Sequence, residues 1–109
     1  MKRQQLTLFV VLMTVMASAE AGRIYGGLQI DGQAVAKGTK IAIDCSGTLF
    51  DTIVQEHGRY SLNVGGQGTC TFSIDGYTGA SIDIVSYAEA TRYNFAISRN
   101  GNIYTMKRK

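Results

Sequence analysis

Apolar and polar residues alternate along most of residues 20–109, and this period of two is typical of half-buried β-strands. Turns containing glycine separate the alternating stretches about every 8–12 residues, a spacing typical of a β-sandwich or barrel. No convincing helical period occurs, and residues 87–91 are predicted as either one helical turn or a loop. The predicted strands are residues 24–30, 40–45, 49–55, 59–64, 69–75, 80–86, 93–98 and 103–106.

The phase of the alternation predicts which side chains face the core. The predicted inward residues are Ile41, Ile43, Cys45, Tyr60, Cys70, Phe72, Ile74, Ala80, Ile82, Ile84, Tyr93, Phe95 and Ile97. Asn100-Gly101 is predicted to form a type I′ turn that folds the last strand back on the one before it. The sequence therefore predicts an all-β fold, a single antiparallel sandwich of about seven to eight strands with a Greek-key arrangement.

The first 19 residues follow the order of a secretory signal peptide. Lys2 and Arg3 provide a positive start, and residues 6–15 are apolar apart from two threonines. This apolar run is shorter than the roughly 20 residues that a membrane-spanning helix needs. The competing interpretation is an N-terminal helix of the mature fold.

Ala17-Ser18-Ala19 supplies the small residues of a cleavage site, and cleavage after Ala21 is the alternative. We expect residues 1–19 to be removed and residues 20–109 to remain as one β-sandwich domain. The mature protein is then secreted or periplasmic, with no stable membrane anchor.

The basic residues of the chain lie mostly at its two ends. Lys and Arg number 11 against 8 Asp and Glu, but Lys2 and Arg3 belong to the predicted signal peptide. Lys107-Arg108-Lys109 form the last three residues and are predicted to be a solvated tail. No basic face is predicted within the fold, so we expect no nucleic-acid partner.

The two cysteines, Cys45 and Cys70, both fall on the inward phase of their strands. An exported chain enters an oxidising compartment, where such a pair forms a disulfide. Redox activity is the alternative, but the C-x-x-C spacing is missing and a buried strand position does not suit a reactive thiol. The sequence therefore predicts one structural disulfide.

His57 is the only histidine, and Glu56-His57-Gly58-Arg59 has the composition of a turn. A catalytic triad could draw only on common neighbours such as Asp51, Glu56 and Ser61, whose spacing is not specific to that chemistry. Zinc needs several His or Cys ligands, and the acids are too scattered for calcium. We expect an exposed turn histidine, with no catalytic residue, no metal and no cofactor.

The six tyrosines are the remaining candidates for a binding surface. Tyr60 and Tyr93 are predicted to point into the core. Exposed tyrosines can stack on a sugar or anchor a protein partner. The candidate binding surface consists of Tyr25, Tyr77, Tyr87 and Tyr104.

Three motifs extend over most of residues 22–98. They are Gly27-x-x-Ile30-Asp31-Gly32-x-Ala34-Val35-x-x-Gly38-x-x-Ile41-x-Ile43, then Gly58-Arg59-Tyr60-Ser61-Leu62, then Phe72-x-Ile74-x-Gly76-Tyr77. With these motifs the chain resembles the carboxypeptidase regulatory-like domain, although Ala34 replaces a usual proline and His57 a usual aspartate. The resemblance implies a transthyretin-like (prealbumin-like) β-sandwich. It also implies a non-catalytic accessory or interaction module, often exported.

The sequence favours a small exported protein that acts by binding and has no enzymatic activity. The first hypothesis is a protein–protein interaction or cell-envelope accessory module. The alternative is a carbohydrate-binding module whose exposed tyrosines stack on sugar rings. A third hypothesis is a secreted inhibitor or immunity-type protein that plugs an enzyme's cleft with residues 65–68 or 87–91. The expected partner is therefore another protein or a glycan.

Overall fold

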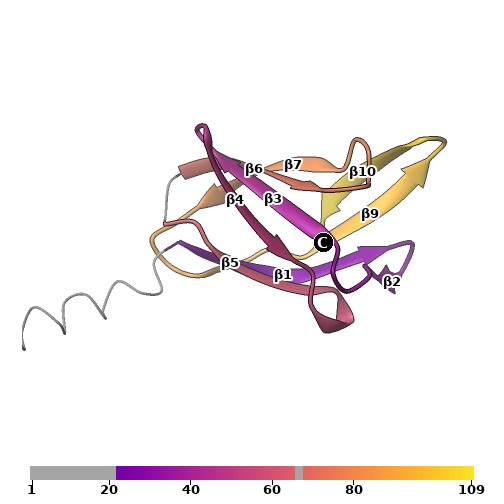
Figure 1. Cartoon of the computed structure of the whole chain (residues 1–109), viewed down its shortest axis with the longest axis horizontal. Coiled ribbons are helices and arrows are strands. Elements are labelled where there is room, and N and C mark those ends of the chain that lie inside the picture. Colours follow the sequence, from indigo (N-terminus) through magenta and orange to yellow (C-terminus); the bar gives the residue numbers. More distant parts are fainter. Residues whose placement is uncertain (1–21, 66–67) are drawn as a thin grey trace, which may run out of the picture.

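The computed structural model describes residues 22–65 and 68–109, which form two β-sheets packed face to face (Figure 1). The predicted signal peptide, residues 1–19, lies outside the described residues. Within them, no helix is long and apolar enough to span a bilayer. The strands are β1 (Arg23–Ile30), β2 (Gln33–Ala34), β3 (Lys40–Cys45), β4 (Thr48–Ile53), β5 (Arg59–Asn63), β6 (Gly68–Ile74), β7 (Ser81–Ser86), β8 (Thr91–Arg92), β9 (Phe95–Asn100) and β10 (Ile103–Arg108). The short 3₁₀ turn η1 (Glu56–Gly58) precedes β5.

The first sheet is built around β1, whose two halves pair with different neighbours. The first half lies between antiparallel β5 and parallel β8. The second half lies between antiparallel β2 and parallel β9, and β10 follows β9 at the edge. Parallel pairing requires a long connection. Here the chain passes through the second sheet before it returns beside β1, so this sheet is mixed where the alternation alone predicts antiparallel strands.

The second sheet has the order β4–β3–β6–β7 and is antiparallel throughout. Its central strands, β3 and β6, carry the two cysteines. Cys45 and Cys70 form the predicted disulfide, with their Cα atoms 4.3 Å apart. The bridge therefore joins neighbouring strands of one sheet, and the two sheets are held together by side-chain packing.

The core lies between the two sheets and confirms the predicted phase of the alternation. All of the predicted inward residues are buried except Ile82, which is partly buried. Phe72 of the second sheet contacts Tyr60 and Phe95 of the first, with ring centroids 5.2 and 5.0 Å away. Burial of these apolar surfaces is the main stabilising contribution to the fold.

The turn between β9 and β10 differs from the predicted one. Ile103 pairs with Asn100, so the two turn residues are Gly101 and Asn102. Of these two, only Gly101 has a positive φ, 67°. A type I′ turn requires positive φ at both positions, whereas a type II′ turn places glycine at the first position alone. The observed turn is therefore type II′.

The basic C-terminus also differs from the predicted solvated tail. Lys107 and Arg108 belong to β10, which continues its pairing with β9 as far as Phe95. The Lys109 amide donates to the Asn94 carbonyl at 2.8 Å. Lys107 and Arg108 are thus the end of an edge strand and Lys109 follows it, while the side chains of all three residues remain exposed, as predicted.

Candidate functional site

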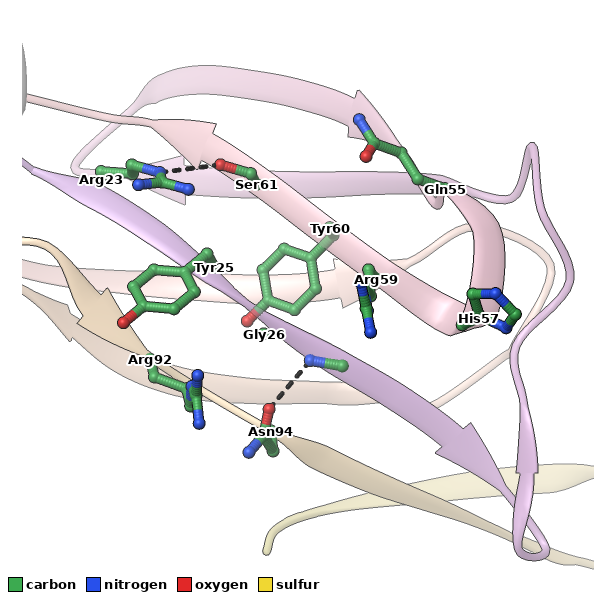
Figure 2. Close-up of a pocket in the computed structure, with 11 residues that line it drawn as sticks. Arg23, Tyr25, Gly26, Gln55, His57, Arg59, Tyr60, Ser61, Arg92 and Asn94 are labelled. Atoms are coloured by element: carbon green, nitrogen blue, oxygen red, sulfur yellow. Dashed lines mark hydrogen bonds between the residues drawn. The ribbon is translucent and has the colours of Figure 1, made fainter.

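A groove with a volume of about 580 Å³ lies where β5, β1 and β8 run side by side (Figure 2). Side chains alternate along β1, which places Arg23, Tyr25 and Gly27 on the same face, and all three line the groove. The strand register sets Ser61 opposite Tyr25 on one side and Arg92 next to Tyr25 on the other. The groove thus collects side chains from three adjacent strands.

The Tyr25 ring is the aromatic centre of the groove. The guanidinium carbon of Arg23 lies 4.9 Å from the ring centroid, and that of Arg92 lies 5.6 Å from it. Arg23 Nε also donates a 3.0 Å hydrogen bond to Ser61 Oγ. Cation–π contacts of this kind orient a guanidinium group without using its N–H donors.

One end of the groove is formed by η1 and the first residue of β5. His57 and Gly58 have φ values of 62° and 72°, so two successive left-handed residues turn the chain. A Cβ on residue 58 would overlap the Leu28 carbonyl oxygen, so this position requires glycine. The turn brings the exposed residues His57 and Arg59 to the groove, together with Gln55.

The floor of the groove is backbone. The Gly27 N–H of β1 donates to Asn94 Oδ1 at 2.9 Å. Asn94 lies between β8 and β9, so its side-chain amide oxygen takes the place of a backbone acceptor from a neighbouring strand. A Cβ on residue 26 would overlap the Tyr93 carbonyl oxygen, whereas a Cβ on residue 27 would meet only Asn94 Oδ1, at 3.8 Å. Close packing therefore explains Gly26 and does not explain Gly27.

Tyr60 lines the groove from the core side, and its hydroxyl group donates a hydrogen bond within the fold. Its phenol donates to the Tyr93 carbonyl at 2.7 Å and is buried. Burial raises the pKa of Tyr60 well above its ordinary value; nearby Tyr93 adds to the rise and the Arg108 guanidinium opposes it. The phenol is therefore neutral at physiological pH.

Positive charge prevails among the residues that line the groove. Arg23, Arg59 and Arg92 contribute to it, and no Asp or Glu is among the lining residues that the structure describes. Among residues 22–65 and 68–109, neither Arg59 nor Arg92 forms an ion pair, whereas Lys37 pairs with Glu56 at 3.5 Å. Within the described residues, the groove is thus a cationic surface without a lining carboxylate.

The four tyrosines of the predicted binding surface occupy three places. Tyr25 lies in the groove. Tyr77 and Tyr104 contact each other edge to face, with ring centroids 5.1 Å apart, and both are half-buried. Tyr87 is 54% exposed on the loop between β7 and β8. Tyr77 and Tyr104 are brought together by packing, and Tyr25 alone among the four lines the cationic groove.

His57 is exposed in a turn, as the sequence predicts. Its place in the lining of a groove that it shares with three arginines is what the sequence does not reveal. In the part of the chain that the structure describes, no three His, Cys, Asp or Glu side chains gather in a way that could hold a metal ion.

Sequence reasoning misses the groove arginines, Arg23, Arg59 and Arg92, and also Asn94. Two of them carried a usable signal: Arg23-x-Tyr25 and Arg59-x-Ser61 share one face of their strands. Arg92 carried none, because β8 contains only two residues and its parallel pairing with β1 is non-local.

No protein-family model matches the chain, and no curated protein matches it. Among solved structures, the chain is similar to a candidate carbohydrate-binding protein from Bacteroides uniformis, with a TM-score of 0.52 and 18% sequence identity. The match covers 80% of this chain and 51% of that one, so this chain spans about half of its length. At this identity the likeness concerns the fold.

Proposed function

We propose that the protein is an exported, non-catalytic carbohydrate-binding module and that the groove over β5, β1 and β8 is its ligand site. The observation that carries this proposal is the combination of groups in the groove. Tyr25 lies beside two guanidinium groups, and the amide side chains of Gln55 and Asn94 line the same groove.

This combination fits the chemistry of a sugar. A sugar ring presents hydroxyl groups to planar polar side chains and C–H groups to an aromatic ring. Binding sites for small ligands generally place a few polar groups around apolar surface in hollows of about 300–1,000 Å³. The groove, at about 580 Å³, is large enough for a short stretch of oligosaccharide.

Gly27 gives independent support. Glycine weakens a strand interior, and there it often marks the close approach of a ligand or another backbone. Among the described residues other than its two chain neighbours, the nearest atom to a Cβ on residue 27 would be Asn94 Oδ1, at 3.8 Å, and the φ of Gly27 is not positive. An approaching ligand accounts for a bare backbone on the groove floor.

The likeness of the fold to a candidate carbohydrate-binding protein supports the same class of function. We also propose that the chain belongs with the carboxypeptidase regulatory-like domains, on the motifs around Gly32, Tyr60 and Tyr77. That membership supports a module that binds without chemical change. A protein partner that docks on the groove is the competing function.

The test is a glycan array probed with the purified protein. We expect binding to a subset of glycans, loss of that binding in Tyr25→Ala, and retention in Tyr87→Ala. Tyr87 is a matched control because it is an exposed tyrosine outside the groove. An array without hits, or equal loss in both variants, would overturn the proposed function. Bound oligosaccharides should be recovered with unchanged chain length, because the module is not an enzyme.

The proposal includes export, which the disulfide supports because such bonds persist in oxidising compartments. Intact mass of the protein from its natural location should show a chain that begins at Glu20, or at Gly22 if cleavage follows Ala21, with both cysteines oxidised. An intact N-terminus, or free thiols, would contradict export.

A further inference from the structure

We infer that the groove selects acidic sugars, those that carry a carboxylate or sulfate group. This inference rests on the proposed carbohydrate-binding function and adds the chemical class of the ligand. Its basis is the balance between hydrogen-bond donors and acceptors in the groove.

The charged groups enter the groove from three separate strands. Arg23 comes from β1, Arg59 from β5 and Arg92 from β8, and His57 lies at the end of the groove (Figure 2). The fold thus gathers basic residues that are far apart in the sequence. A hollow lined by one sign of charge attracts ligands of the opposite sign.

The groove offers an excess of donors. A guanidinium group has five N–H donors and no acceptor. Two neutral acceptors in the groove are already engaged, since Ser61 Oγ accepts from Arg23 and Asn94 Oδ1 accepts from Gly27. A neutral sugar hydroxyl needs an acceptor for its proton, whereas a carboxylate or sulfate oxygen only accepts. The donor-rich groove therefore suits an oxyanion better than a neutral hydroxyl group.

Two of the arginines have the freedom to meet such an oxyanion. Arg59 and Arg92 are exposed, and within residues 22–65 and 68–109 no carboxylate pairs with either. The Tyr25 ring orients Arg92, which leaves the guanidinium edge for a charge-assisted, bidentate contact. Pre-orientation of this kind lowers the entropy cost of binding.

The test compares pairs of polysaccharides that differ mainly in charge. Polygalacturonate is compared with its methyl ester, and dextran sulfate with dextran, by titration calorimetry on the purified protein. We expect at least one acidic member to bind about tenfold or more tightly than its neutral counterpart, with affinity falling as salt rises. The pair that shows the preference separates a carboxylate ligand from a sulfate ligand.

Single charge removals locate the effect. Arg59→Gln and Arg92→Gln should each weaken binding of the acidic polymer about tenfold while leaving the denaturation midpoint close to wild type. Arg99→Gln is the matched control: it removes an exposed arginine that lies over Tyr104, outside the groove, and should leave binding unchanged. Equal weakening in all three variants would overturn the inference, because it would indicate a general charge effect.

The outcomes separate this inference from the proposed function. Equal binding of acidic and neutral members supports a carbohydrate site and overturns the acidic preference. Poly-L-glutamate that binds as tightly as the acidic polysaccharides would overturn the carbohydrate function itself. If neither acidic polymer binds while neutral glycans bind on the array in a Tyr25-dependent way, the acidic preference fails and the proposed function holds.

Discussion

The phenol of Tyr60 donates a 2.7 Å hydrogen bond to the backbone carbonyl of Tyr93, and that carbonyl occupies the space that a Cβ on Gly26 would fill. Gly26 pairs with Tyr60 across β1 and β5. The missing side chain lets the segment between β8 and β9 approach β1 closely. The same approach positions Asn94 to bind the Gly27 amide on the groove floor.

Two neighbouring glycines should therefore respond differently to alanine. Gly26→Ala should lower the free energy of unfolding by about 3 kcal/mol, because its Cβ overlaps a backbone oxygen that cannot move alone. Gly27→Ala should change it by less than about 1 kcal/mol, because its Cβ makes only an ordinary contact. Urea denaturation measures both values, and equal stabilities for the two variants would contradict the packing argument.

A larger side chain on the groove floor should block the ligand without harming the fold. Gly27→Val introduces a residue favoured in strands, directed into the groove. We expect a denaturation midpoint close to that of wild type and loss of most glycan binding on the array. Undiminished binding in a folded Gly27→Val protein would place the ligand elsewhere.

Tyr60 should make stability depend on pH in the alkaline range. Because burial raises its pKa, the folded protein keeps the phenol proton where the unfolded chain, with a pKa of about 10, has lost it. The unfolded state then binds fewer protons, so this contribution to stability is complete below pH 10 and declines as the pH rises further. Near neutral pH the contribution of Tyr60 to stability is constant.

Tyr60→Phe tests this dependence. At neutral pH the variant should be about 1 kcal/mol less stable, through loss of the hydrogen bond to Tyr93. Above about pH 10 its stability should fall less steeply than that of wild type. Identical slopes for wild type and Tyr60→Phe would contradict the assignment.

The disulfide should contribute a large share of the stability. Cys45 and Cys70 are 25 residues apart, and closing a loop of that length is worth about 3.5 kcal/mol in the unfolded chain. The paired variant Cys45→Ala/Cys70→Ala should lose about that much in urea denaturation. An unchanged midpoint would show that the neighbouring strands β3 and β6 need no covalent link.

The sequence predicts those parts of the fold that depend on local pattern. The phase of Cys70, Phe72 and Ile74 follows from the period of a single strand, and the disulfide follows from two cysteines that share that phase. The sequence predicts the turn at Gly101 one residue out of register, because Asn100-Gly101 and Gly101-Asn102 are both favourable turn pairs.

The groove could not be predicted in the same way, because it depends on which strands are neighbours. Arg59 and Arg92 reach Tyr25 only through the pairing of β1 with β5 and with β8. The pairing of β1 with β8 is parallel, and β8 contains only two residues. A segment this short has no periodic pattern from which the pairing could be predicted. The sequence predicts Tyr25 as a candidate on exposure alone and does not predict its neighbours in the groove.

The most direct test of the account is an NMR titration of the nitrogen-15-labelled protein with an oligogalacturonate. The account predicts that the largest shift changes occur at the backbone amides of Gly27, Arg59 and Arg92 and at the side-chain amide of Asn94. The amides around Tyr77 and Tyr104 should stay unchanged. Shift changes centred on Tyr77 and Tyr104, with none at the groove residues, would contradict the assignment of the groove as the ligand site.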